Sequence, residues 1–280
     1  MKADLHLHSS ASDGRLSPEE LVKLAARLGL EVIAITDHDS VEGIAPALEA
    51  ARAYPKLTVI PGVEINTDIP GDEVHILGYF VDYRDQGLKV VLERLRGTRE
   101  ERAKGMIAKL AKLGIRIEWG RVRQLAGDGS VGRPHVAQAM LEAGYISTLG
   151  EAFVKYIGRD GPAYVERERM TPAEAVQLVL KVRGLPVLAH PAELKDRENL
   201  VRELRKAGLV GLEAYYNGYS HQTTAELAAL AGKEGLALTG GTDYHGLEGM
   251  MEREPGSIEV PEEAVRRFLL LAEKSSGVRP

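Results

Sequence analysis

The stretch 2-KADLHLHSSASDGRLSPEELVKLAARLGLEVIAIT-36 predicts a strand, a loop, a helix and a second strand. Its two ends, 2–7 and 32–36, are short and mostly apolar runs of the kind that form buried strands. Between them, Ser17 and Glu20 form a capping box with Pro18 at the first helical position, which marks the start of a helix. This order indicates a parallel βαβ unit.

The same alternation of apolar runs and amphipathic segments continues along the chain. Further strands are predicted at 58–65, 74–80, 185–190, 209–215 and 236–240, with a weaker one at 257–260. Thr171 and Glu174 repeat the capping box ahead of another helix. Seven or so such units favour an α/β fold closed into a barrel over an open parallel sheet.

Residues 98–167 interrupt this alternation. They predict four helices, at 98–114, 118–126, 134–144 and 148–158, and no strand of comparable strength. We therefore expect a small inserted helical subdomain at 98–167 between two parts of the barrel, 1–97 and 168–280. The sequence 127-GDGSVG-132 fits the glycine pattern of dinucleotide sites, but a helix precedes it where that site requires a strand.

Composition limits the possible classes of protein. The chain has 280 residues, no cysteine and a net charge of -5, so disulfides and thiolate metal sites are excluded and a surface that wraps duplex DNA is not expected. No apolar run reaches the roughly 18 residues of a membrane-spanning helix, and the first residues lack the pattern of a secretory signal. We expect a cytoplasmic protein with no membrane partner and no obligate protein partner.

Histidines and acidic residues lie near the ends of most predicted strands. His6 and His8 close the first strand, where positions i and i+2 point to one side, so both rings can reach one ion. The loops after barrel strands converge at one face, where active sites collect. Asp4 and Asp37 are expected to orient ligands through hydrogen bonds, Asp4 by bonding an imidazole. The nine plausible metal ligands are His6, His8, Asp13, His38, Glu64, His75, His190, Asp243 and His245.

This set of ligands has a defined chemistry. Imidazoles and carboxylates without sulfur suit zinc, manganese or iron. Nine ligands are too many for one ion, so two or three divalent ions that share a carboxylate are expected. A buried cluster this polar would otherwise cost several kcal/mol.

Taken in order, the motifs resemble those of the PHP family, the polymerase and histidinol phosphatase superfamily. They are D-L-H-x-H with Asp13, T-D-H at 36–38, P-G-V-E at 61–64, H-I-L-G-Y at 75–79, A-H-P at 189–191 and G-T-D-x-H at 241–245. The resemblance covers the chain outside the insertion and implies a distorted (β/α)7 barrel. The insertion, with 132-GRPHVA-137, resembles the bacterial subgroup that hydrolyses nucleoside 3′,5′-bisphosphates, some members of which trim RNA from the 5′ end.

The resemblance also implies how the ligands divide among three ions. His6, His8, Glu64 and Asp243 would hold the first ion, and Glu64, His75 and His190 the second. The third would take Asp13, His38 and His245. Two ions about 3.5–4 Å apart suit hydrolysis of phosphate esters, because they neutralise charge on the phosphoryl group and lower the pKa of a water from 15.7 toward roughly 7. No residue is assigned as the acid for the leaving group.

A phosphate remote from the ions needs other partners, and the expected substrate is a small phosphorylated nucleotide or a short RNA end. Arg133 and His135 lie at the start of a predicted helix, where free N–H groups and a guanidinium can bind an anion. His221 follows a strand at the same face and is a third candidate for substrate binding. Three tyrosines could stack a base or simply line the cleft: Tyr215, Tyr216 and Tyr219.

Three alternatives stay open at this point. An amidohydrolase of C–N bonds also opens with His-x-His, but it would need a bridging lysine where this chain has 74-VHILGYF-80. A histidinol phosphatase lies within the same family, although the insertion disfavours it. A non-catalytic PHP accessory module would have no need of a complete ligand set.

Overall fold

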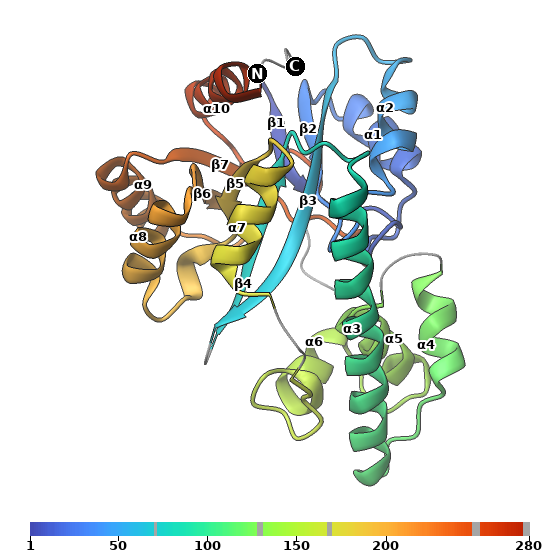
Figure 1. The fold of residues 1–280 in the computed structure, drawn as a ribbon. Helices are drawn as coiled ribbons and strands as arrows, with labels where there is room; N and C mark the ends of the chain where they lie inside the picture. Colours follow the sequence, from blue (N-terminus) through green and yellow to red (C-terminus); the bar gives the residue numbers. More distant parts are fainter. Residues whose placement is uncertain (70–71, 128–130, 167–169, 248–252, 277–280) are drawn as a thin grey trace.

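The computed structural model describes the chain except residues 70–71, 128–130, 167–169, 248–252 and 277–280. One strongly curved sheet contains seven strands in sequential order (Figure 1). They are β1 (Ala3–Leu7), β2 (Val32–Ile35), β3 (Thr58–Ile69), β4 (Asp72–Tyr79), β5 (Leu185–Leu188), β6 (Gly211–Tyr216) and β7 (Ala237–Gly241). Beyond β7 the chain bonds back to β1 through Asp243 N to His6 O (2.9 Å) and His8 N to Tyr244 O (3.0 Å). The predicted distorted barrel is confirmed.

Strand β4 runs opposite to both of its neighbours, so the prediction of parallel units throughout was wrong at this point. β3 and β4 pair antiparallel, with Glu64 opposite Leu77 and Asn66 opposite His75, and β4 pairs antiparallel with β5. A parallel connection needs a crossover of a dozen or more residues, whereas only residues 70–71 separate β3 from β4. The reversal places His75, in the first half of β4, near Glu64 in the middle of β3.

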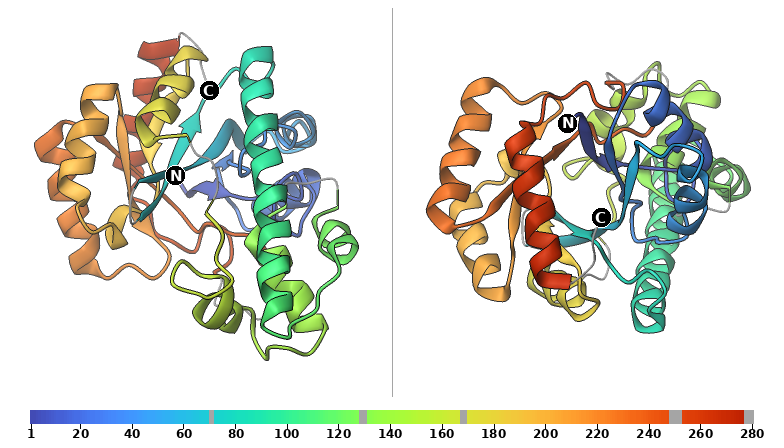
Figure 2. Two further views of the ribbon diagram at one scale, coloured as in Figure 1. Left: turned by 60° about the horizontal axis from the view of Figure 1, so that its bottom comes forward. Right: turned by 90° about the horizontal axis from the view of Figure 1, so that it is seen from above.

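Six helices pack around the barrel, and two of them begin at the predicted capping boxes. Ser17 caps α1 and Thr171 caps α7, each with its glutamate returning the bond. α10 lies across one end of the barrel (Figure 2), where Phe268 packs edge-on against Tyr79. The residues 257–260 form no strand and lead into α10. The six helices are α1 (Pro18–Arg27), α2 (Ile44–Ala51), α7 (Pro172–Lys181), α8 (Arg197–Ala207), α9 (His221–Glu234) and α10 (Glu262–Ser276).

The inserted segment forms a helical layer below the barrel in Figure 1. Its own hydrophobic cluster extends from Ala103 to Ala163 and includes Met106, Val136 and Met140. The first helix of the layer, α3, starts at Gln86, so the division expected at residue 97 falls inside a continuous helix. Its helices are α3 (Gln86–Lys112), α4 (Trp119–Ala126), α5 (Arg133–Glu142) and α6 (Leu149–Ala152), which continues into the π-helical turn Phe153–Ile157.

Among the described residues, no helix is long and apolar enough to cross a bilayer.

Candidate metal centre

Glu64 on β3 is the centre of the polar cluster at the open end of the barrel. Its side chain is buried, and its Oε2 lies 3.1 Å from Nε2 of both His6 and His8 and 3.0 Å from Nδ1 of His38. Its Oε1 lies 2.7 Å from Nδ1 of His75 and 3.2 Å from Nε2 of His190. One carboxylate therefore contacts five imidazoles that come from four different segments, as a bridge between ions requires.

The first group of candidate ligands combines β1 with the segment after β7. Its four members, His6, His8, Glu64 and Asp243, offer ligand atoms that all lie within 4.8 Å of one another. Oδ1 of Asp243 is 3.2 Å from Nε2 of His6 and 2.9 Å from Nε2 of His8. These are the four residues that the family resemblance implies for the first ion.

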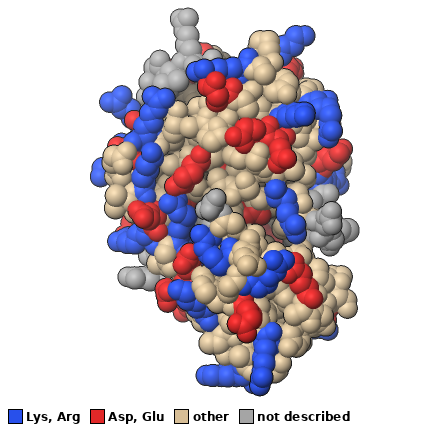
Figure 3. All heavy atoms as spheres, turned by 90° about the vertical axis from the view of Figure 1, so that its right-hand side faces the viewer, with Lys and Arg blue, Asp and Glu red and all other residues tan. Residues whose placement is uncertain are grey.

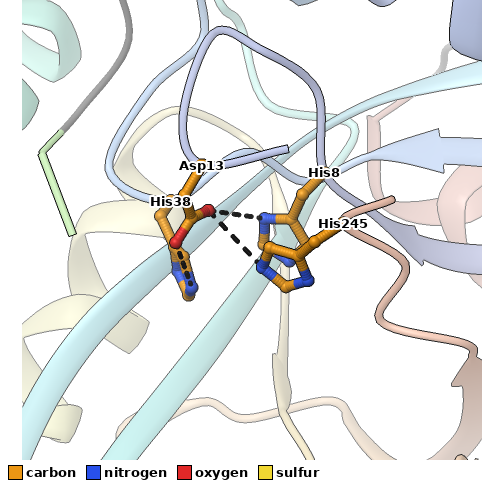
Figure 4. Close-up of side chains that lie close together, drawn as sticks. All are labelled: His8, Asp13, His38 and His245. Carbon is orange, nitrogen blue, oxygen red and sulfur yellow. Dashed lines mark ion pairs between the residues drawn. The ribbon is translucent and has the colours of Figure 1, made fainter. Parts of the chain in front are cut away.

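A second group surrounds Asp13, on the loop after β1 (Figure 4). Oδ1 of Asp13 lies 3.4 Å from Nε2 of His245 and 3.8 Å from Nδ1 of His8, and Oδ2 lies 4.0 Å from Nε2 of His38. The rings of His8 and His245 are stacked with their centroids 4.1 Å apart. The structure thus brings together the three residues expected for the third ion and adds His8 as a neighbour.

A third group contains His38, Glu64 and His75, again with ligand atoms within 4.8 Å of one another. His190 adjoins it, since its Nε2 is 3.2 Å from Nδ1 of His75. All nine predicted ligands therefore converge at one end of the barrel. Their individual roles as ligands remain a proposal.

The residues present fit divalent ions. Several buried polar atoms of the cluster have no hydrogen-bond partner, although imidazoles and carboxylates surround them; these atoms are Nδ1 and Nε2 of His8, Oδ1 of Asp13, Nδ1 of His38 and Oδ1 of Asp243. Buried polar atoms are normally satisfied. Atoms of this type that point at one another without hydrogen bonds are the donors that a cation binds.

The charges of the cluster favour cations as well. Burial would raise the pKa of Glu64, but the imidazoles of His38, His6 and His75 outweigh it and hold the pKa well below its usual range. Burial lowers the pKa of His38 to about 3, so this ring is neutral and able to bind metal. Burial also acts to lower the pKa of His75, but Glu64 and Glu73 raise it to about 9. A proton on such a ring is the charge that a metal ion displaces when it binds.

Two of the candidate ligands lie on unusual backbone. His190 has φ +26° and Asp243 has φ +54°, values in the left-handed region that side chains other than glycine rarely adopt. His190 lies two positions beyond the end of β5, and its ring faces Glu64. Asp243 lies two positions beyond the end of β7, and its carboxylate faces His6. Backbone strain of this kind costs about 1–3 kcal/mol and clusters at functional sites.

The two acidic residues expected to orient ligands accept hydrogen bonds from backbone N–H groups and from hydroxyls. Asp4 accepts hydrogen bonds from Thr242 N and Oγ1, Gly256 N and His6 N, so its expected contact with an imidazole was wrong. Asp37 accepts bonds of 2.7 Å from Ser9 N, Ser9 Oγ and Ser12 Oγ. Asp37 therefore fixes the loop that carries Asp13.

Glu213, Asn66 and Tyr216 contact the candidate ligands, and the first two were not among the residues predicted from the sequence. Glu213 bonds Nδ1 of His6 (3.0 Å), and Asn66 bonds Nε2 of His75 (2.8 Å). Tyr216 donates to Asp243 (2.7 Å), a role different from the base stacking considered for it. A glutamate inside the apolar run 209-LVGLEAY-215 was the available signal for Glu213.

A cleft runs from the metal-ligand groups to the inserted helices. Four candidate ligands line its inner end, namely Asp13, His38, His75 and His245. Three arginines line the same cleft, and they are Arg99, Arg102 and Arg133. Arg133 lies at the first position of α5, over the ring of Phe153, and pairs with Glu73 at 2.6 Å.

The other predicted substrate contacts lie differently. His135 is buried and accepts the N–H of Gly132 at its Nδ1 (2.9 Å), which leaves only Nε2 for a ligand. His221 is exposed at the start of α9 and does not line the cleft that contains the three arginines. Tyr219 accepts the N–H of Ala192 through its hydroxyl (3.0 Å), beside the loop of His190. The binding roles of Arg133, His135 and His221 remain proposals.

Comparisons with known proteins agree with this geometry. The PHP domain model matches residues 4–149. A 5′-3′ exoribonuclease of Haemophilus influenzae is 35% identical over 248 residues, which cover 87% of this chain and 90% of that protein. A 3′,5′-nucleoside bisphosphate phosphatase of Chromobacterium violaceum is 31% identical and covers 86% of each chain. A proposed metal-dependent phosphoesterase of Bifidobacterium adolescentis has a TM-score of 0.87 at 28% identity and covers 96% of this chain and 95% of its own.

Proposed function

The chain belongs to the PHP family and is a metal-dependent phosphoesterase, and from this premise we propose that it removes the 3′-phosphate of nucleoside 3′,5′-bisphosphates. The nine candidate ligands would hold two or three ions, with manganese, zinc or iron suited to their donor set. When bound, such ions polarise the phosphoryl oxygens and lower the pKa of a water toward roughly 7.

The observation that carries this proposal is the cleft that joins the candidate ligands to the arginines. Arg99, Arg102 and Arg133 line the same cavity as His75 and the rest of the ligand set. A substrate with two phosphates can place one phosphate at the ligands and the other among the guanidinium groups, which bind phosphate through paired hydrogen bonds. A phosphate monoester with no second anion would leave these guanidinium groups with the carboxylates of Asp39 and Glu73 as anionic partners.

Glu73 shapes the outer part of this site. Its carboxylate pairs with Arg133 at 2.6 Å and lies 3.8 Å from Nη1 of Arg102. Burial would raise the pKa of Glu73, but the imidazole of His75 and the guanidinium groups of Arg133 and Arg102 hold it well below its usual range. A bound phosphate therefore has to share the arginines with a permanent carboxylate, which favours a doubly charged terminal phosphate over a singly charged diester.

A short RNA with a 5′-phosphate is a second candidate substrate. Relative to the 5′-phosphate, the first phosphodiester of such an RNA occupies the same position as the 3′-phosphate of a bisphosphate. The same cleft therefore suits both reactions. Basic and acidic side chains are interspersed over the face in Figure 3, so this face offers no continuous basic track for a longer strand or a duplex.

Two other reactions fit the site less well. Amidohydrolases use a bridging lysine on the fourth strand, whereas β4 has the sequence DEVHILGY and Glu64 on β3 lies between the groups. Histidinol phosphate carries one phosphate and an ammonium group. The ammonium would meet the three arginines of the cleft and be repelled.

The experiment is a phosphate-release assay with purified protein and added Mn²⁺. It compares adenosine 3′,5′-bisphosphate with adenosine 3′-monophosphate, histidinol phosphate, and a short RNA carrying either a 5′-phosphate or a 5′-hydroxyl. We expect the highest kcat/KM for the bisphosphate and cleavage of the RNA only with its 5′-phosphate. A Glu64→Gln protein serves as the control for contaminating phosphatase. Equal kcat/KM values for the bisphosphate and the 3′-monophosphate would contradict the proposal.

A further inference from the structure

Glu213 is a carboxylate buried in the middle of β6, and both of its oxygens are used. Oε1 lies 3.0 Å from Nδ1 of His6, and Oε2 accepts the backbone N–H of His190 at 2.8 Å. Its side chain is fully buried, as is that of His6. Among the ion pairs of the described residues, Glu213 pairs with His6 alone, and no lysine or arginine is paired with it. Burying a carboxylate without a permanent cation costs free energy of folding, so a role in the site is a reason for its presence.

The bond to His6 fixes the tautomer of that ring. A carboxylate only accepts hydrogen bonds, so Nδ1 of His6 has to carry the proton. Nε2 then keeps its lone pair when the ring is neutral. That atom lies 3.1 Å from Glu64 Oε2 and 3.2 Å from Asp243 Oδ1, at the place proposed for the first ion. The carboxylate therefore directs the lone pair of His6 to the ion.

The bond to His190 acts on a second group of ligands. His190 has left-handed backbone, with φ +26° and ψ +57°. Glu213 Oε2 accepts the N–H of this strained residue, and the ring of His190 reaches Glu64 Oε1 at 3.2 Å on the side proposed for the second ion. The hydrogen bond therefore helps to hold a conformation that would otherwise relax.

We propose that Glu213 is a positioning residue that orients one ligand of each of two metal sites, His6 through its ring and His190 through its backbone. The proposal rests on the metal ligands of the proposed function and does not depend on which substrate is hydrolysed. Strand β6 supplies no ligand of its own to the three groups. In this proposal β6 contributes to the metal sites through the contacts of Glu213 with His6 and His190.

The test is the metal affinity of a Glu213→Gln protein. An amide cannot accept at both of its ends. If its NH₂ group faces His6, Nδ1 must accept, and the proton moves to Nε2, where it blocks the ion. If the NH₂ group faces His190, it opposes the backbone N–H. We expect Zn²⁺ affinity, measured by calorimetric titration of metal-free protein, to fall about 10–100-fold, which is the usual effect of such a change. Hydrolysis should recover partly at raised metal concentration.

Tyr79→Phe is the matched control. Tyr79 is also fully buried in the barrel, and its hydroxyl donates to Leu5 O (2.9 Å) beside His6, but among the hydrogen bonds of the described residues it bonds no candidate ligand side chain. We expect this variant to lose stability and keep its Zn²⁺ affinity within about twofold, since no lone pair is redirected. Unchanged affinity in folded Glu213→Gln protein would overturn the proposal.

A measurement on the unchanged protein covers the case in which Glu213→Gln does not fold. Proton–nitrogen NMR of the Zn²⁺-loaded chain, labelled at histidine nitrogen, identifies which ring nitrogen of His6 carries hydrogen. The proposal requires a protonated Nδ1 and a metal-bound Nε2. A proton on Nε2 would contradict it. Because neither readout involves a substrate, failure of the phosphatase assay and failure of this proposal are distinguishable.

Discussion

Tyr216 donates a 2.7 Å hydrogen bond to Oδ2 of Asp243, while Oδ1 of the same carboxylate faces His6 and His8. The hydroxyl thereby occupies one oxygen and leaves the other for an ion. Burial and the charge of Asp243 raise the pKa of Tyr216 well above its usual value, so the phenol stays protonated and always donates. Asp243 itself has left-handed backbone, with φ +54°.

Replacing Tyr216 with phenylalanine removes this donor and keeps the ring. The free Oδ2 can then turn toward the ion, and the fixed single-oxygen geometry is lost. We expect a decrease of about tenfold in metal affinity or kcat, the lower part of the range for residues that orient ligands. Metal titration and initial rates check this. Tyr215→Phe on the same strand is the control, and a loss of equal size in both variants would show that the effect is not specific to Asp243.

Removing metal should destabilise the folded protein. The clustered donors of the candidate centre repel one another or carry protons when no ion neutralises them, and an ion present at a thousand times its Kd stabilises the native state by about 4.1 kcal/mol. We therefore expect a chelator to lower the midpoint of thermal unfolding by several degrees and Mn²⁺ to restore it. The Glu64→Gln variant lacks the bridging carboxylate, and its midpoint should respond little. An identical response in both proteins would place the stabilising ion elsewhere.

The carboxylate of Asp37 anchors the loop that carries Asp13. Asp37→Asn loses one acceptor oxygen of a residue that takes three bonds of 2.7 Å from Ser9 and Ser12. We expect the ion near Asp13 to be lost first while the ion near His6 remains, since β1 is held independently. Metal analysis after dialysis measures this as a lower ratio of metal to protein. Ser12→Ala, which removes one of the three bonds, should lose less, and simultaneous loss of every ion would contradict the expectation.

Local signals in the sequence predicted most of the barrel. The capping boxes at Ser17 and Thr171 begin helices in the structure, and the seven main apolar runs became its seven strands. The antiparallel direction of β4 was missed because it depends on the length of the connection between β3 and β4. The hydrophobic periodicity of a strand does not indicate its direction. The dipeptide Pro70-Gly71, between the apolar runs 58–65 and 74–80, is a turn signal from which a hairpin could have been predicted.

The candidate ligands were predictable for a different reason from the residues that hold them. Ligands such as His8 and His190 end strands, and strand ends of a barrel converge whatever the details of packing. The contacts of Glu213 with His6, which is 207 positions away, and of Asn66 with His75 depend on tertiary register. Nothing local in the sequence determines such a register, although a charged residue in an apolar strand marks the position as unusual.

Arg133 provides the last prediction, which separates the distal phosphate from the reacting one. Arg133→Ala removes a guanidinium from the cleft and frees Glu73, whose charge then repels a phosphate. A hydrogen bond to a charged group contributes about 1.5–3 kcal/mol, so KM for adenosine 3′,5′-bisphosphate should rise roughly 10–100-fold. For 4-nitrophenyl phosphate, which has no second phosphate, we expect little change. Arg121→Ala on α4 removes a guanidinium that pairs with Glu142 on the surface, and it should alter neither KM. Equal increases for both substrates in Arg133→Ala would exclude Arg133 from binding the distal phosphate.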